Sequence, residues 1–179
     1  MSLEDFRGHA LRGSPTAWDR PTFLHVRIAL DRTDGEVPAL VAAKARLDPD
    51  EAREVAAAAL DDYLNSLVRS LRNLAAGRAL EGRLDAIESI GPLLTTVFAM
   101  EARVRPYNKW LSHELAVRPL AGWDPLPILD RLVTDPDPTT QREAFRVVER
   151  LARRVGHGDV IDGWAPELAW LRGDATGAT

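Results

Sequence analysis

The sequence predicts an all-α fold, an antiparallel helix bundle built on a long helical hairpin with short appended helices. Two long helical segments separated by a glycine, together with the scarcity of alternating β-branched runs, lead to this prediction. The chain has 179 residues, of which 45% are hydrophobic and 28% are charged. This length and composition suit a single globular domain with one core.

The clearest predicted helix begins after Asp48. The Asp48 carboxylate suits an N-cap, and Pro49 and Glu51 suit the first and third helical positions. An unbroken run rich in alanine, leucine and arginine then continues to Gly77, a residue that favours the position after a helix end. The pattern predicts a helix of about 27 residues, roughly 40 Å long at the usual rise per residue.

A second long helix is predicted over residues 79–103. It follows a tight turn, so we expect it to pack antiparallel to the first helix and to close a hairpin. Pro92 lies inside this segment and lacks the amide proton of a helical residue. We therefore expect a kink near Gly91.

Shorter helices and less regular segments flank the predicted hairpin. The shorter helices are expected over residues 21–30, 37–46, 107–117, 126–133, 138–155 and 160–171. Residues 1–20 contain glycine, serine and proline with little periodicity, which predicts an irregular N-terminal arm. Residues 21–172 then form the bundle domain, and residues 173–179 form a flexible tail.

The charge and the absence of cysteine limit the kinds of site that we expect. A net charge of -4 gives no whole-chain reason to expect nucleic acid or an anionic membrane as a partner. The chain has no cysteine, which excludes disulfides, thiolate catalysis and cysteine-bound metals. The first residues are charged, and the longest weakly polar run, residues 90–100, is too short to span a bilayer. These features predict a cytoplasmic protein.

A polar band follows one face of the predicted hairpin. The residues that recur at helical spacing on the first helix are Asp61, Asn65, Arg69 and Arg72. In an antiparallel hairpin the arginines of this row would lie near Asp85 and Glu88. Two interpretations are open: a solvated network of salt bridges between helices, or one wall of a ligand site.

A second group of polar residues surrounds Pro106. Its members are Glu101, Arg103, Arg105, Tyr107, Asn108 and Lys109. Guanidinium groups can grip pairs of oxygens, an ammonium supplies a point charge, and a following helix N-terminus adds N–H donors. The group therefore suits a polyphosphate. The alternative is a charged connection between helices that Tyr107 and Trp110 anchor to the core.

Other common sites are not predicted. The four histidines show no metal-ligand spacing, and the sequence has no G-x-S-x-G elbow and no glycine-rich phosphate loop. Asp31 and Asp34 follow a glycine and a serine, as metal carboxylates do in nucleotidyl transfer. Their spacing is wrong, because such carboxylates must be one residue apart on a strand to share a face.

Three stretches resemble the helical region that follows the catalytic domain in bacterial nucleotidyltransferase-domain proteins. They are residues 63–71, residues 84–89, and residues 103–111 with Glu114 and Leu115. The tripeptide Tyr107-Asn108-Lys109 in its arginine-proline setting is the most specific part. The similarity runs from about Arg12 to Arg172, and this helical region is related in shape to the C-terminal domain of kanamycin nucleotidyltransferase.

The resemblance implies the helical substrate- and nucleotide-binding half of a nucleotidyltransferase, without the catalytic domain that holds the metal. Arg105, Tyr107, Asn108 and Lys109 would then face the nucleotide or a small-molecule acceptor. Asn65, Arg69 and Asp85 would line the adjoining wall, and Glu88 would be a possible base. Mg²⁺ and a nucleoside triphosphate are implied for the complete enzyme. Its catalytic domain would lie upstream or on another polypeptide, so no activity is expected of this chain alone.

The alternative is a non-catalytic interaction or dimerisation module, with a separate minimal nucleotidyltransferase as its partner. Ribonuclease bundles of such systems carry an arginine four to six residues before a histidine. Here seven residues separate Arg105 from His113, which disfavours RNA cleavage and a nucleic-acid partner. A third possibility is a bundle whose polar band is only solvated surface.

Overall fold

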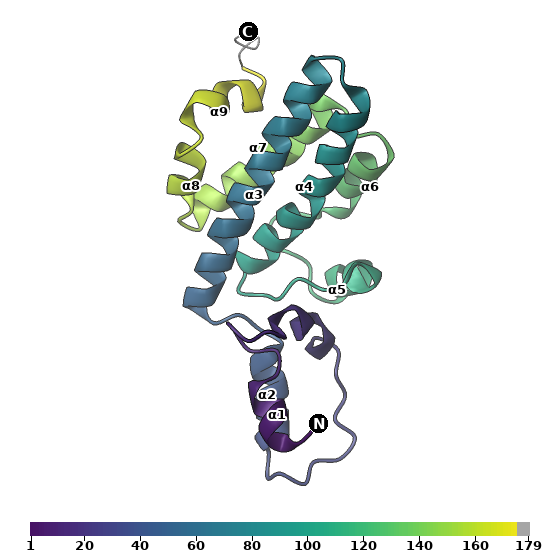
Figure 1. The fold of residues 1–179 in the computed structure, drawn as a ribbon, viewed down its shortest axis with the longest axis vertical. Coiled ribbons are helices and arrows are strands. Elements are labelled where there is room, and N and C mark those ends of the chain that lie inside the picture. The colour runs from purple at the N-terminus through teal and green to yellow at the C-terminus, as the bar shows by residue number, and fades with distance from the viewer. Residues whose placement is uncertain (175–179) are drawn as a thin grey trace.

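A computed structural model of the protein describes residues 1–174, and within these residues every regular element is a helix. The all-α prediction is therefore confirmed. Figure 1 shows the arrangement: α3 and α4 form a long hairpin, α6 and α7 lie behind it, and α1 and α2 lie below the end at which α3 begins. Within the described residues no helix is both long enough and apolar enough to cross a membrane.

The hairpin follows the predicted boundaries closely at three of its four ends. Helix α3 spans Pro49–Ala75, and the Asp48 carboxylate caps it by accepting the Glu51 amide at 2.9 Å. Gly77 adopts φ 73°. The Arg78 amide donates to the Asn73 carbonyl at 2.9 Å, and this hydrogen bond ends the helix. Helix α4 spans Ala79–Ala99 and continues through Pro92, so the predicted kink stays a prediction.

Helix α4 ends four residues before the predicted Arg103. Ala102 takes a left-handed conformation with φ 54°, and Arg103 pairs with Arg46 in an isolated antiparallel bridge. The Leu47 amide also donates to the Ala102 carbonyl at 3.1 Å. The chain therefore leaves the helix early because its backbone groups pair with the segment that precedes α3.

The core lies between the hairpin and the C-terminal helices. These helices are α6 (Leu126–Thr134), α7 (Pro138–Arg154), α8 (Gly158–Asp162) and α9 (Ala165–Arg172). Leu64 of α3, Phe98 of α4 and Phe145 of α7 are fully buried in one apolar cluster. The Asp137 side chain caps α7 by accepting the amides of Thr139 and Thr140. Helices α6 and α7 lie near the predicted ranges, whereas the single helix predicted over residues 160–171 is wrong, because the chain forms α8 and α9 with Gly163 and Trp164 between them.

Residues 3–47, which we name the N-terminal lobe, differ from the prediction. The lobe holds α1 (Leu3–Gly8), the 3-10 helix η1 (Ala17–Phe23) and α2 (Glu36–Lys44), the last as predicted. The irregular arm is wrong over α1, which Ser2 and Asp5 start through reciprocal capping bonds. The predicted α-helix over residues 21–30 is also wrong, because the chain forms η1 and then continues without a regular element. Of its apolar residues Phe23 is buried and Leu24 is partly buried, whereas Val26, Ile28 and Leu30 are exposed, so most of the stripe covers no core.

Buried charges hold the N-terminal lobe together and connect it to α3. Arg20 pairs with Glu51 at the start of α3 and also donates from Nε to the Lys44 carbonyl at 3.2 Å. The Lys44 ammonium donates to the His9 carbonyl at 2.5 Å and lies 5.0 Å from the centre of the Phe6 ring. Burial, and to a smaller extent the charge of Arg20, lowers the pKa of Lys44.

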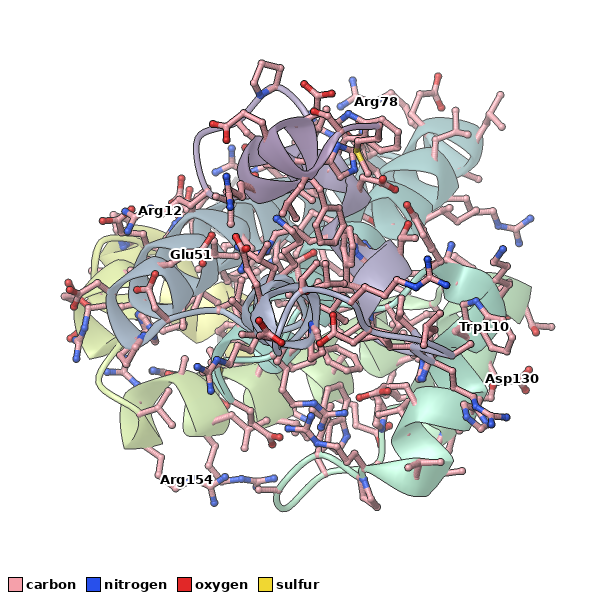
Figure 2. The ribbon with its side chains drawn as sticks, turned by 90° about the horizontal axis from the view of Figure 1, so that it is seen from below. Arg12, Glu51, Arg78, Trp110, Asp130 and Arg154 are labelled. Atoms are coloured by element: carbon pink, nitrogen blue, oxygen red, sulfur yellow. The ribbon has the colours of Figure 1, made fainter. Side chains whose placement is uncertain are left out.

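The segment after α4 carries η2 (Asn108–Trp110) and α5 (Leu111–Val117), in place of one predicted helix over residues 107–117. Figure 2, seen from below, shows Trp110 near the edge of the molecule and Glu51 inside it. Gly173 ends α9 in a left-handed conformation with φ 82°. Residues 175–179 of the expected tail lie outside the described residues.

Candidate functional site

The polar band on the hairpin forms as a network of ion pairs. Arg69 of α3 contacts Asp85 at 2.8 Å and also pairs with Glu88, both on α4. Asn73 donates to the other oxygen of Asp85 at 2.7 Å. The predicted contact of Arg69 with both carboxylates is therefore confirmed.

Other members of the polar band lie apart from this network. Arg72 pairs with Glu167 of α9 and not with Asp85 or Glu88, so that part of the prediction is wrong. Asn65 is exposed on α3. Helical rotation turns Arg72 away from α4 and toward the last helix, which the sequence could not place.

The Arg69 network is open to solvent. The side chain of Glu88 is 62% exposed and that of Arg69 is 43% exposed. Exposed pairs of this kind contribute about 0–1 kcal/mol to stability because water screens them. These contacts suit a solvated network, and the roles of Asn65, Arg69, Asp85 and Glu88 in substrate binding stay predictions.

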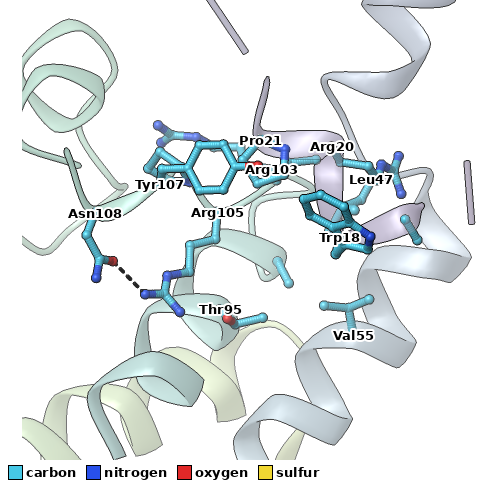
Figure 3. A pocket seen from close by; sticks show the side chains of 14 residues that line it. Trp18, Arg20, Pro21, Leu47, Val55, Thr95, Arg103, Arg105, Tyr107 and Asn108 are labelled. Atoms are coloured by element: carbon cyan, nitrogen blue, oxygen red, sulfur yellow. Dashed lines mark hydrogen bonds between the residues drawn. The ribbon is translucent and has the colours of Figure 1, made fainter. Parts of the chain in front are cut away.

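A cavity of about 660 Å³ lies between the N-terminal lobe and the lower end of the hairpin. Figure 3 shows its walls, which come from η1, the start of α3, the end of α4 and the segment after α4. The lining residues are Ala17, Trp18, Arg20, Pro21, Leu47, Val55, Thr95, Ala99, Arg103, Val104, Arg105, Pro106, Tyr107 and Asn108. The cavity is thus mostly apolar, with three arginines and no carboxylate among its lining residues.

Arg105 is the lining arginine whose charge is not balanced by a neighbouring carboxylate among the described residues. It donates to the Gly91 carbonyl at 3.0 Å and to the Asn108 side-chain oxygen at 2.8 Å, and both acceptors are neutral. Desolvation by the surrounding walls lowers the pKa of Arg105. An arginine stays charged at neutral pH even so, and a charge in this setting favours an anion as its neighbour.

The other two lining arginines have carboxylate partners. Arg20 pairs with Glu51, as described above. Arg103 contacts Glu114 at 2.7 Å and Glu101 at 3.2 Å. These side chains contribute polar surface to the cavity while their charges are compensated behind its wall.

Arg103 is also packed against an aromatic ring. Its guanidinium carbon lies 4.8 Å from the centre of the Phe98 ring. The Nε atom is buried and has no hydrogen-bond partner among the described residues. The side chain is thereby held in place by contacts on several sides.

Aromatic side chains bring the N-terminal lobe to the cavity. The Tyr107 hydroxyl donates to the Asp19 carboxylate at 3.2 Å, which ties η1 to the segment after α4. Trp18 is 71% exposed, although it lines the cavity, so it lies at the rim. One open edge of the cavity therefore has a large planar side chain that solvent can reach.

The predicted binding residues fall into separate places. Arg105, Tyr107 and Asn108 line the cavity, whereas Lys109 does not. The Lys109 ammonium lies 6.0 Å from the ring centres of both Tyr107 and Trp110 on the outer surface. Along α3, Arg69 is about 21 Å from the lining residue Val55 at the usual helical rise. The two polar groups therefore do not form one compact site.

Sequence reasoning missed the contribution of the N-terminal lobe. Trp18 and Arg20 were placed in an irregular arm, and Val55 was one apolar residue among many. A tryptophan in a segment with few other apolar residues was the available signal for Trp18. Nothing local in the sequence pairs Arg20 with Glu51.

The resemblance implies that the carboxylates for magnesium lie in the catalytic domain of the complete enzyme. Among residues 1–174 no group of three or more histidine, aspartate or glutamate side chains is placed to hold a metal ion. Asp85 and Glu88, the carboxylates of the band, are instead bonded to Arg69.

Comparisons with protein families, with curated proteins and with solved structures found no match for this chain. The resemblance to the helical region of nucleotidyltransferase-domain proteins therefore stays a prediction.

Proposed function

We propose that this chain is the substrate-binding helical half of a nucleotidyltransferase whose catalytic domain lies elsewhere. The observation that carries the proposal is the Arg105 guanidinium on the wall of a cavity of about 660 Å³, a charge with no carboxylate partner among residues 1–174. A volume between about 300 and 1,000 Å³ is typical of small-molecule sites. The residues that resemble the family most specifically, Tyr107 and Asn108, line the same cavity.

The proposal assigns binding to this chain and metal chemistry to its partner. Guanidinium groups recognise carboxylates and phosphates through pairs of parallel hydrogen bonds. The catalytic domain would supply the carboxylates for Mg²⁺ and bind the nucleoside triphosphate. In that complex Glu88 would be the candidate base and Lys109 an outer contact to the phosphates.

The test combines this chain with the nucleotidyltransferase catalytic domain that is encoded upstream of it or next to it. With Mg²⁺, nucleoside triphosphate labelled at the α-phosphate and a small-molecule cell extract, we expect label to enter the small-molecule fraction only when both parts are present. Arg105→Met should lower the rate about tenfold or more, because a charged hydrogen bond to substrate is lost. Arg150→Met, at an exposed position on α7, is the matched control. Failure of the two parts to associate, or transfer that is indifferent to Arg105→Met, would overturn the proposal.

One observation favours the alternative of a dimerisation module. Leu80, Leu84 and Ile87 lie at helical spacing along α4 and are 68%, 60% and 51% exposed. Such a row suits contact with another helix, and a second copy of the chain is the simplest partner. Sedimentation of the purified chain tests this: a dimer that Leu84→Glu converts to a monomer supports the alternative, and a monomer at all concentrations removes it.

A further inference from the structure

The cavity combines one uncompensated charge with a large apolar surface. Its apolar walls include Val55 of α3, Ala99 of α4, and Leu47 and Val104 on either side of the bridge between the lobe and the hairpin. Burying apolar ligand surface against such walls is favourable by roughly 25 cal/mol for each Å². A ligand with only polar surface would forgo this contribution.

The charges around the cavity indicate the charge of the ligand. Arg20 is neutralised by Glu51, and Arg103 has Glu101 and Glu114 as partners. Arg105 is left with neutral acceptors only, among the residues that the structure describes. One positive charge without a counter-charge matches a monoanion. The triphosphate of a nucleotide would bring several negative charges to the same place.

Arg105 has donors to spare for such an anion. A guanidinium carries five N–H donors in a planar fork, and the contacts to Gly91 and Asn108 use one on each terminal nitrogen. The exposed Asn108 amide can also turn to offer its own donors. A carboxylate can therefore reach Arg105 without breaking an ion pair.

We propose that the cavity binds a small amphipathic monocarboxylate, with its carboxylate on Arg105 and its hydrocarbon or aromatic body against Val55, Trp18 and the neighbouring apolar walls. This ligand is distinct from the nucleotide. The inference rests on the proposed function only where the ligand is taken to be the acceptor of the complete enzyme. The binding step itself needs no catalytic domain.

The experiment titrates the full chain by calorimetry with octanoate, octan-1-ol and acetate, which separate the charge from the apolar body. We expect octanoate to bind with one site per chain, about tenfold or more tighter than either octan-1-ol or acetate. Arg105→Met should weaken octanoate binding about tenfold or more and leave octan-1-ol binding unchanged. Arg150→Met serves again as the control and should bind octanoate as the unchanged protein does.

A second variant keeps the test valid if Arg105→Met does not fold. Asn108→Asp changes an exposed side chain and places a carboxylate beside the Arg105 guanidinium. The variant should lower the affinity for octanoate about tenfold, because the new carboxylate at position 108 would take the place of the ligand carboxylate beside Arg105. Trp18→Phe should remove the change in tryptophan fluorescence that octanoate produces at the rim.

Several outcomes would overturn the inference. Equal affinities for octanoate and octan-1-ol would show that charge does not contribute, and unchanged octanoate binding in Asn108→Asp would place the ligand elsewhere. Displacement of octanoate by ATP with Mg²⁺ at similar concentration would make the cavity a nucleotide site, which would sink this inference and leave the proposed function standing. If the chain binds octanoate but never associates with a catalytic domain, the proposed function would be overturned and this inference would stand.

Discussion

The bundle and the N-terminal lobe are held together by different forces. In the bundle, Leu64, Phe98 and Phe145 are fully buried among apolar neighbours from several helices. In the lobe, the buried side chains include Arg20 and Lys44, which reach carbonyls and a carboxylate on distant segments. Apolar burial tolerates small shifts, whereas hydrogen bonds to a buried charge depend on distance and direction.

The cavity lies where these two kinds of structure meet. Val55 and Ala99 come from the packed hairpin, whereas Trp18 and Pro21 come from the lobe. A small apolar cluster that includes Leu47 joins the two parts. The bundle therefore supplies one wall of the cavity, and the lobe supplies the opposite wall.

The largest expected effect is a loss of bundle stability. Phe145→Ala should lower the free energy of unfolding by about 3–5 kcal/mol, because it removes a buried ring and leaves a void. Chemical denaturation monitored by circular dichroism measures the change. Val133→Ala, at an exposed position on α6, should change the free energy by about 0.5 kcal/mol or less. A small effect of Phe145→Ala would mean that apolar packing does not distinguish the bundle.

The matching change in the lobe is Glu51→Gln. It leaves the buried Arg20 without its counter-charge, which typically costs about 3 kcal/mol or more. We expect faster hydrogen exchange of the amides in α1 and α2 while α7 keeps its protection. Asp50→Asn, at the exposed neighbouring position, is the control. Uniform loss of protection across both parts would contradict the division between lobe and bundle.

A polar contact inside the bundle gives an intermediate effect with a pH signature. The buried Glu149 carboxylate of α7 accepts bonds from Arg172 of α9 and from Arg153, which lower its pKa. Its contribution to stability is present above the ordinary glutamate pKa of about 4.3 and is lost as the pH falls through the lower pKa of the folded state.

Glu149→Gln should therefore destabilise the protein by about 1–3 kcal/mol at pH 7. The stabilities of the two proteins should converge as the pH falls below the folded pKa of Glu149. Thermal melts from pH 7 to pH 3 measure the difference. If the stability difference between the two proteins stays constant from pH 7 to pH 3, the charge of Glu149 does not connect α7 and α9.

The smallest expected effect is at the turn of the hairpin. Gly77 has φ 73°, and a left-handed conformation costs an ordinary residue about 1 kcal/mol. Gly77→Ala should lower the free energy of unfolding by this amount. Gly8→Ala is the comparison, because Gly8 is the last residue of α1 and has an ordinary helical conformation, in which alanine is favoured. Equal effects of the two changes would mean that the turn conformation does not matter.

The sequence was sufficient for the hairpin because its signals are local. Asp48, Pro49 and Gly77 mark helix ends through contacts within a few residues. The spacing of α3 and α4 also placed Arg69 beside Asp85 and Glu88. Helix ends and contacts across a tight hairpin depend on residues that are close in the chain, so they can be predicted from a single sequence.

The lobe and the cavity could not be predicted in the same way. Arg20 meets Glu51 across 31 positions of the chain, and Tyr107 meets Asp19 across 88. The apolar stripe with Phe23 suggested an α-helix, but beyond Leu24, which packs partly against a core cluster, its apolar residues are exposed. Long-range polar contacts of this kind leave no periodic pattern. Only part of the cavity wall, namely Arg103, Arg105, Tyr107 and Asn108, could therefore be predicted from the sequence.

The bridge between Arg46 and Arg103 bears on how quickly a ligand could come and go. It joins the segment that leads into α3 to the segment that leads out of α4, and Leu47 and Val104 beside it line the cavity. Collective motions of whole segments take microseconds to milliseconds. A bulky ligand between Trp18 and Val55 whose exit required these two segments to separate would have a residence time limited by that motion as well as by its own affinity.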